Sequence, residues 1–427
     1  MHEGGRPRLS VVVIGAGAIG LCAALALQED GHSVTVLDPA GPGEGATAGN
    51  PGGISVSSIF PAAVPGVHRK VPGWILDRDG PLTVRWRRLP ALAPWLIRFL
   101  AAARPERAAA AVTALHALTA EAPALYAPFL ARAGATDLIR RDGHLVVYRS
   151  AAAMAEEAAS WQRRSALGIV VQELGPEVRD LEPELAPGIA CGRLVPGNAH
   201  CTDPRALMQL FASALEREGG RLLRVAARDL VLADGRVAAV LTEAGEISAD
   251  AVVLAAGAHA AALARRLGDR VPLEPERGYH AEIRDCPLRL RRPVFSTAEK
   301  VFCASMESGL RFAGTAEFAG LAAAPVRRRA ESLLALGRGI FPRLASPAPG
   351  EVVTRWMGFR PSTPDGLPVV GLSSRARNAV HAFGHGHVGL TGAAMTGRIV
   401  AALVGGRVPP VPLAPFDPRR FRAGQPA

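Results

Sequence analysis

Three glycines near the N-terminus have the spacing of a phosphate-binding turn. Gly15, Gly17 and Gly20 follow the apolar run Val11–Ile14, which suits a buried parallel strand, and helical periodicity begins directly after them. The first glycine permits a tight turn, the second admits a pyrophosphate close to the backbone, and the third lets the helix pack near the strand. The phosphates would then lie on the helix N-terminus, whose free amides attract anions.

An acidic residue completes this pattern. Residues 33–37 read as a second strand, and Asp38 follows it directly, 18 residues after Gly20. At that distance a carboxylate can accept hydrogen bonds from a ribose diol, and its charge disfavours a 2′-phosphate. Strand, glycines, helix, strand and acid in this order predict a βαβ unit that binds a dinucleotide.

A loop of small residues leaves the second strand. It runs as GPGEGATAGNPGGIS and includes Asn50, Gly52, Gly53 and Ser55. Glycines let backbone approach a planar ligand closely, so the loop is predicted to contact the ligand, although a flexible surface loop is the alternative.

Composition narrows the class of protein. The net charge of +11 comes almost wholly from arginine, only three tyrosines occur, and the short basic runs are scattered, which argues against nucleic-acid binding. Five cysteines without a CxxC pair indicate neither a disulfide framework nor a metal site. The polar lead before Val11 is unlike a secretion signal, so a cytoplasmic protein is expected. Apolar runs without charge are too short to cross a bilayer, so no membrane span is expected.

The middle of the chain contains both helical and strand patterns. Asp203 and Pro204 predict the start of a helix that ends near Gly219. A turn is expected at Asp234–Gly235, and a further buried strand over 252–255. A strand is predicted over 143–150 with a helix over 151–167. Residues 271–348 alternate apolar and polar, with strands over 278–284, 301–305 and 309–314 and a helix over 326–336.

The stretch Leu89–Ala103 is strongly apolar and is broken by Pro94. A core-facing helix is the leading interpretation, and an amphipathic helix on a membrane surface is the alternative.

These segments predict an α/β fold with an α+β second lobe. A Rossmann-type nucleotide-binding domain is expected from residues 8–59, 196–270 and 350–427. A substrate domain built on an antiparallel sheet is expected from residues 60–195 and 271–349, so that the two domains interleave along the chain.

Four separated motifs together resemble the glycine oxidase and D-amino acid oxidase superfamily of FAD-dependent oxidoreductases, closest to its D-amino acid dehydrogenase branch. They are VIGAGAIG with Asp38, GNPGGIS, ADAVVLAAGAHA, and WMGFRPSTPDGLPVVG followed by GHGHVGLT. The resemblance covers essentially the whole chain, and it implies FAD as the cofactor.

The resemblance also implies which residues bind FAD. The pyrophosphate would lie on the first glycine turn, the ribose at Asp38, the adenine at the backbone of Ala227, the isoalloxazine beside the second loop, and the flavin O2 at the start of the last helix. The matching residues are Gly15, Ala16, Gly17, Ile19, Gly20, Asp38, Asn50, Gly52, Gly53, Ile54, Ala227, Gly257, Gly386, His387, Val388, Gly389, Leu390 and Thr391. Two positions depart from the family, which usually has valine at Ala227 and often glycine at His387.

For the substrate, the resemblance points to Arg360, whose guanidinium would bind a carboxylate in bidentate fashion. Arg277, Tyr279 and His280 are weaker candidates for the pocket wall, of which Tyr279 is preferred, although an ordinary sheet aromatic is an equal alternative. His387 or His385 could assist deprotonation of the amine, with a structural histidine as the alternative.

The implied reaction is oxidative deamination of a D-amino acid by hydride transfer from its α-carbon to flavin N5, giving a 2-oxo acid and ammonia. Cyclic or N-methylated amines such as D-proline, hydroxyproline, sarcosine or glycine are the alternative substrates. The electron acceptor, oxygen or a quinone, stays open. Two other classes are disfavoured: a flavin-dependent tRNA-modifying enzyme is expected to carry an extra domain, and a mere nucleotide-binding protein would not need Arg360.

Overall fold

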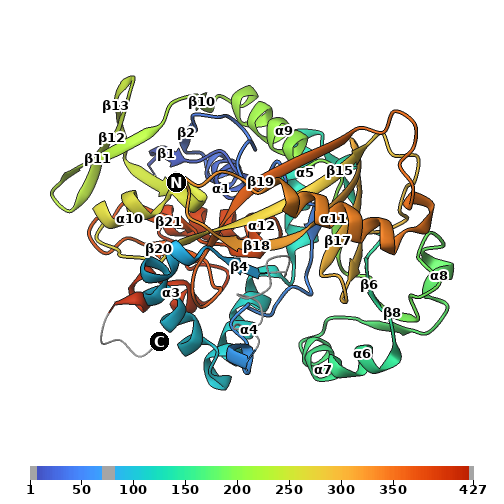
Figure 1. Ribbon diagram of the computed structural model, residues 1–427. Coiled ribbons are helices and arrows are strands. Elements are labelled where there is room, and N and C mark those ends of the chain that lie inside the picture. The colour runs from blue at the N-terminus through green and yellow to red at the C-terminus, as the bar shows by residue number, and fades with distance from the viewer. Residues whose placement is uncertain (1–6, 70–81, 423–427) are drawn as a thin grey trace.

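The computed structural model describes residues 7–69 and 82–422, and the first six residues of the polar lead lie outside this range. Two large sheets dominate the part of the chain that is described (Figure 1). One has six strands in the order β10-β2-β1-β14-β21-β20, and the other has nine strands. The α/β fold class with an antiparallel second lobe is confirmed.

The six-stranded sheet is parallel except at one edge, where β20 runs antiparallel to β21. Its strands are β10 (Arg221–Leu223), β2 (Ser33–Leu37), β1 (Ser10–Ile14), β14 (Ala251–Leu254), β21 (Ala379–Phe383) and β20 (Val369–Leu372). The predicted βαβ unit is β1, α1 (Ala18–Glu29) and β2. The four residues of β14 are all buried, as the apolar run predicted.

Alternation along β1 divides the core into two layers. Val11 and Val13 face a helical layer, whereas Val12 and Ile14 face the opposite side. The helical layer comprises α1, α5 (Ala122–Ala133), α9 (Pro204–Arg217) and α12 (Gly389–Val404). The other layer comprises α10 (Ala261–Arg266) and a three-stranded sheet of β11 (Ala227–Ala233), β12 (Arg236–Thr242) and β13 (Gly245–Ser248). The parallel sheet is therefore covered on both faces.

Local signals in this lobe are confirmed. Asp203 caps α9 by accepting hydrogen bonds from the amides of Arg205 and Ala206. Asp234 and Gly235 both adopt positive φ, 48° and 68°, in the turn between β11 and β12.

The nine-stranded sheet is mostly antiparallel, and α11 (Arg327–Ile340) packs against it. Its strands are β19 (Val353–Ser362), β15 (Glu274–Arg284), β18 (Gly309–Phe318), β17 (Val301–Met306), β16 (Val294–Ser296), β6 (His144–Tyr148), β8 (Cys191–Val195), β7 (Gln172–Leu174) and β4 (Leu82–Val84). The strands and the helix expected between 271 and 348 all occur, with β15 and β18 longer than predicted. A small sheet of β3 (Gly53–Ile54), β9 (Ala199–Cys201) and β5 (Ile139–Arg140) lies apart from both.

Three segments differ from expectation. β19 pairs with β15 along its whole length, although its residues fall in the range assigned to the nucleotide-binding domain. Conversely, α5 packs in the nucleotide-binding core, although its residues fall in the range assigned to the substrate domain. The helix predicted over 151–167 is two helices, α6 (Ala151–Glu156) and α7 (Ala158–Ala166), which meet at Glu157. The domain boundaries themselves stay a prediction.

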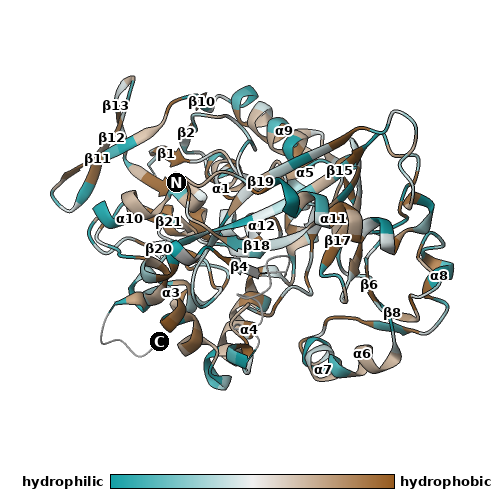
Figure 2. Cartoon of the chain, viewed as in Figure 1, coloured by the Kyte–Doolittle hydropathy of each residue, from teal (hydrophilic) through white to brown (hydrophobic). Residues whose placement is uncertain are grey.

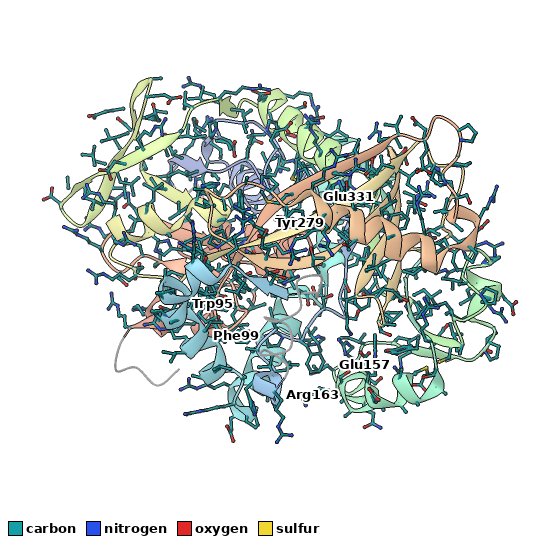
Figure 3. The ribbon with its side chains drawn as sticks, viewed as in Figure 1. Trp95, Phe99, Glu157, Arg163, Tyr279 and Glu331 are labelled. Atoms are coloured by element: carbon teal, nitrogen blue, oxygen red, sulfur yellow. The ribbon has the colours of Figure 1, made fainter. Side chains whose placement is uncertain are left out.

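The apolar stretch forms the helix α3 (Leu89–Ala102) (Figure 2). Pro94 lies inside this helix. Leu92, Trp95 and Phe99 are buried, and the rings of Trp95 and Phe99 stack with centroids 5.3 Å apart (Figure 3). The core-facing interpretation is confirmed for this side of the helix. The alternative, that the exposed side of this helix lies on a membrane surface, stays a prediction.

Two helical stretches have the length and hydropathy of a membrane span, 105–133 and 386–404. The first comprises α4 (Pro105–Thr119) and α5, and the second ends with α12. The apolar windows are 44% and 72% buried, and both helices contribute to the core around α1. We interpret them as core helices, and the expectation that the chain does not span a membrane stays a prediction.

Two glycines of α11 offer a matched test of packing. A Cβ on Gly337 would lie 2.4 Å from the ring of Phe312, which is fully buried, whereas a Cβ on Gly339 would meet nothing within 4 Å. We expect Gly337→Ala to lower stability by about 1–3 kcal/mol through overpacking, despite its better helix propensity. Gly339→Ala should instead raise it by about 0.5–1 kcal/mol. Unfolding of both variants in denaturant checks this, and equal effects would contradict it.

Candidate functional site

The glycine turn has the geometry that its spacing predicts. Gly15 has φ +113°, and a Cβ there would lie 2.4 Å from the carbonyl oxygen of Ala255. A Cβ on Gly20 would lie 1.8 Å from the carbonyl oxygen of Gly15, so the turn and the helix require both glycines. Gly17 is different, because a Cβ there would meet only Thr47 Oγ1, at 3.6 Å. The protein therefore leaves space beside Gly17, where a ligand is expected.

The N-terminus of α1 suits an anion. Its N-cap, Gly17, has no side chain to cap the helix, and the first turn, which includes Ile19, carries no acidic residue. The amide of Ala18 donates to Thr47 Oγ1 at 3.3 Å. The helix dipole thus meets no negative side chain in its first turn.

Asp38 lies at the end of β2, beside the glycine turn. Its Oδ2 accepts from the amide of Ala16 at 2.9 Å, and its Oδ1 accepts from the amides of Ala40 and Gly41 at 2.9 and 3.1 Å. A carboxylate oxygen can accept more than one hydrogen bond, so Asp38 can hold this turn and also meet a ribose. Its ribose contact stays a prediction.

The second loop is built into the structure rather than free on the surface. Asn50 Oδ1 accepts from the amide of Gly52 at 2.8 Å, and Gly52 has φ +81°. Gly53 and Ile54 form β3, which pairs with β9. Arg311 of β18 donates to the carbonyl oxygen of Asn50 at 2.6 Å. The loop therefore connects the nucleotide-binding lobe to the large sheet.

The start of the last helix contacts this loop. Gly386, with φ +49°, begins the short 3-10 helix Gly386–Val388, and α12 follows from Gly389. Thr391 Oγ1 accepts from the amide of Ser55 at 3.0 Å, and Tyr126 donates to the carbonyl oxygen of Leu390 at 2.7 Å. The structure thus brings the loop and the helix start together, as the predicted flavin site requires.

The remaining cofactor candidates lie at the same edge of the sheet. Gly15, Asp38 and Gly257 follow the carboxyl ends of β1, β2 and β14, which are adjacent and parallel. Ligands of open α/β sheets bind at this edge. Ala227 begins β11, and its partly buried side chain packs against the core on the α10 side of the sheet.

Arg360 lies in β19 opposite Glu276 of β15. Its Nη1 donates to Glu276 Oε1 at 2.9 Å and to the carbonyl oxygen of Thr315 at 3.0 Å. The guanidinium lies over Gly278, where a Cβ would be 2.5 Å from its Cζ. No described protein group accepts from Nη2 or Nε, and the side chain is 24% exposed. One edge of the guanidinium is therefore available to a carboxylate.

Glu276 is the residue of this site that the sequence motifs did not indicate. It is buried, and its oxygens accept from Arg360 Nη1, from Ser362 Oγ at 2.8 Å, and from His387 Nε2 at 3.0 Å. Burial alone raises the pKa of this carboxyl, but the nearby His387, Arg360 and Ser362 outweigh it and hold the pKa well below its usual range. Glu276 is therefore ionised.

Tyr279 and Arg277 do not belong to this group, which corrects the preference for Tyr279 as a pocket residue. Successive residues of β15 face opposite sides of the sheet, and Tyr279 packs with α11 in the core of that lobe (Figure 3). Its hydroxyl donates to Glu317, and burial raises its pKa. Arg277 is fully buried and donates to the carbonyl oxygens of Gly320 and Ala324.

His280 and His385, the other histidines considered for the site, make structural contacts. The ring of His280 stacks on Trp356 with centroids 5.3 Å apart, and its Nδ1 lies 3.0 Å from the carbonyl oxygen of Gly49. Burial lowers the pKa of His280 to about 4 and that of His385 to about 3, so both are neutral near pH 7. His385 Nε2 lies 2.9 Å from Thr396 Oγ1. Of the two histidines considered for deprotonation, only His387 meets the Arg360 group.

In the described parts of the chain, 7–69 and 82–422, no group of three metal-ligating side chains is found. The five cysteines are buried free thiols, none of them beside Arg360.

These residues fit FAD. The space beside Gly17 at an uncapped helix N-terminus suits a pyrophosphate, and a second uncapped helix start, at Val388, faces the loop that holds Asn50. Among the described residues, neither helix start has an acidic side chain in its first turn to repel an anion.

The two kinds of glycine in the first turn predict two kinds of variant. We expect Gly20→Ala to cost about 1–3 kcal/mol of stability or more, because its Cβ collides with backbone. Gly17→Ala should fold normally but bind FAD at least about tenfold more weakly, equivalent to about 1.4 kcal/mol. Thermal unfolding of the apoprotein and titration of flavin fluorescence separate the two effects. If both variants bind FAD as tightly as the wild type, the assignment of this turn to the pyrophosphate is contradicted.

The chain matches a known family of oxidoreductases over most of its length. The family model described as DAO, FAD dependent oxidoreductase, matches residues 10–403. The chain is 41% identical to a D-amino-acid oxidase of Bradyrhizobium diazoefficiens, covering 96% of this chain and 98% of that one. It is 35% identical to D-amino acid dehydrogenase 2 of Ralstonia nicotianae, covering 96% and 99%.

Among solved structures, glycine oxidase of Geobacillus kaustophilus has a TM-score of 0.74 at 23% identity, covering 98% of this chain and 100% of that one. L-proline dehydrogenase of P. horikoshii has a TM-score of 0.75 at 19% identity, covering 97% and 98%. These two show the shared fold. With the family match over most of its length, the chain belongs to the DAO family of FAD-dependent oxidoreductases.

Proposed function

We propose that the protein oxidises a D-amino acid to the imino acid, which hydrolyses to a 2-oxo acid and ammonia. The observation that carries this proposal is the free edge of Arg360, held beside the start of α12 by its contact with Glu276. The relatives named D-amino-acid oxidase and D-amino acid dehydrogenase support the same substrate class. Bound FAD supplies the two-electron acceptor for the hydride of the α-carbon.

The protein residues orient the substrate for this transfer. The guanidinium of Arg360 presents two parallel N–H groups, so a carboxylate bound in bidentate fashion fixes the position of the α-carbon. Glu276 and the carbonyl of Thr315 hold the other side of the guanidinium. Arg360 can therefore meet a carboxylate without first losing its own position.

Flavin bleaching tests the proposal directly. The holoprotein is mixed without oxygen with D- and L-amino acids, with D-proline and hydroxyproline, and with sarcosine and glycine. Bleaching by D-amino acids supports the proposal. Bleaching by the cyclic or N-methylated amines alone would favour the alternative substrate class, and bleaching by none would reject both.

We also propose that α3 rests on an anionic membrane surface on the cytoplasmic side. The side chains of Ile97 and Leu100 are 68% and 45% exposed. In the same segment of the chain Arg87, Arg98 and Arg104 are exposed, and none of the three forms an ion pair with another described residue. Exposed apolar residues bordered by arginines suit the headgroup region of a bilayer. Such a position would favour a membrane quinone over dissolved oxygen as electron acceptor.

Replacement of Arg360 tests its role in substrate binding. We expect Arg360→Leu to raise KM about 100-fold or more, because removing a charged partner of a carboxylate costs about 2–5 kcal/mol. FAD should stay bound, since Arg360 bonds to Glu276 and Thr315, neither of which is a cofactor candidate. Arg360→Lys keeps the charge without the fork and should show an intermediate KM. Unchanged KM in Arg360→Leu would rule out its assigned role.

Substitution on the exposed face of α3 tests the membrane proposal. The measurement is sedimentation with vesicles of equal parts phosphatidylcholine and phosphatidylglycerol. We expect the wild type to bind at low salt and Ile97→Asp/Leu100→Asp to bind more than about tenfold more weakly, because each large apolar side chain contributes about 1.5–3 kcal/mol when buried. Leu336→Asp/Val408→Asp, two exposed apolar residues elsewhere, is the control with the same charge change. Equal loss in both would contradict the proposal.

A further inference from the structure

His387 and the buried Glu276 form a pair whose hydrogen bond determines the state of the histidine. His387 Nε2 lies 3.0 Å from Glu276 Oε1. An ionised carboxylate only accepts hydrogen bonds, so Nε2 carries the proton and donates it. In the neutral imidazole the second nitrogen, Nδ1, then keeps its lone pair. Glu276 thus selects the tautomer of His387 in which Nδ1 is a base.

Glu276 is held rigidly enough for this role. It lies opposite Arg360 in the paired strands β15 and β19, and Ser362 Oγ donates to its second oxygen. Three donors on a buried carboxylate keep it in one orientation and keep it ionised. When His387 takes up a second proton, the charge of the imidazolium forms beside this carboxylate and is stabilised by it.

The position of His387 suits proton transfer from the substrate. Its side chain is 57% exposed, and no described residue bonds to Nδ1. Arg360 Nη1 and His387 Nε2 donate to the same oxygen of Glu276, so the carboxylate-binding group and the base are neighbours. An α-amino acid separates its carboxylate from its amine by a single carbon. One substrate molecule can therefore meet both residues.

We infer, and the inference rests on the proposed function, that His387 is the general base that deprotonates the substrate's ammonium group and that Glu276 positions it. The N–H bond of the ammonium breaks, its proton goes to His387 Nδ1, and the amine keeps the electron pair. The neutral amine can then share that pair with the α-carbon as the hydride leaves, which converts the substrate to the iminium ion, the protonated form of the imine; bound FAD would supply the hydride acceptor. The exposed imidazolium returns the proton to solvent.

Among the residues that the structure describes, few charged groups face His387. Glu276 comes from β15 and Arg360 from β19, the two strands beside it. On its own segment the nearest titratable residue is His385, which is buried and bonded to Thr396 of α12. The first charged residue of α12, Arg398, pairs with Glu29. Among the described residues, Glu276 and Arg360 are thus the charged groups that face His387.

The experiment measures the rate of anaerobic flavin reduction by a D-amino acid across pH 6 to 10 in wild type, His387→Asn, Glu276→Gln and the double variant. Near pH 7 each single variant should lose about 100-fold, the typical effect of a general base. The loss should disappear at the highest pH, where the dissolved amine is already neutral. The double variant should lose no more than either single one, because the two residues act as a unit. A loss of equal size at every pH, or no loss near pH 7, would overturn the inference.

A binding measurement distinguishes this role from a structural one. The affinity of the holoprotein for propionate, a carboxylate without an amine, is measured by calorimetry. It should change by less than about threefold in His387→Asn, since Arg360 is intact, and a large loss would overturn the inference. His259→Asn, an exposed histidine of the same lobe, is the control and should keep the wild-type pH profile. Should no amino acid bleach the wild type, the proposed function itself has failed.

Discussion

A buried carboxylate between two strands imposes the main constraint on this site. An ionised group removed from water is costly unless its lone pairs meet donors, and a buried pair that loses one member is strongly destabilised. Glu276 meets this requirement with Arg360, Ser362 and His387. The same contacts that make the carboxylate tolerable also fix the side chains that would bind the substrate, so folding and function depend on one cluster.

The cluster in turn depends on how the two lobes meet. Arg311 of β18 bonds to the backbone of Asn50 and forms an ion pair with the buried Glu282. The stacked rings of His280 and Trp356 lie against Gly49, where a Cβ would be 2.1 Å from the indole. Close backbone approach thus joins the loop that follows the nucleotide-binding unit to the face of β15 and β19. Gly49 is therefore needed for the packing between the two lobes, in addition to any contact of the loop with a ligand.

The features that could be predicted from the sequence are those determined by residues close together in the chain. The glycine turn, the cap at Asp203 and the hairpin at Asp234 depend on residues near in sequence, and all occur in the structure. The alternation of apolar and polar residues predicts the antiparallel lobe. It does not predict which residues of each strand face which side of the sheet. Without the register, Tyr279 and Glu276 were equally placed to face Arg360, and only the pairing of β15 with β19 decides for Glu276. Four charged residues, Glu274, Glu276, Arg277 and Glu282, are buried in this strand, so charge was a signal for the strand but did not single out Glu276.

A strained residue lies beside Arg360, where the pairing of β15 with β18 is irregular. The pairing of β15 with β18 is irregular between Arg277 and Tyr279, and opposite this irregularity Thr315 adopts φ +57°. A β-branched residue at positive φ costs of order 1–3 kcal/mol, and such residues concentrate at functional sites. The conformation directs the carbonyl of Thr315 to Arg360 Nη1, while its own Oγ1 is buried without a partner. The bulge thus lowers stability, but it provides the carbonyl of Thr315 as a second acceptor for Arg360. This contact holds the guanidinium in place while its other edge stays free.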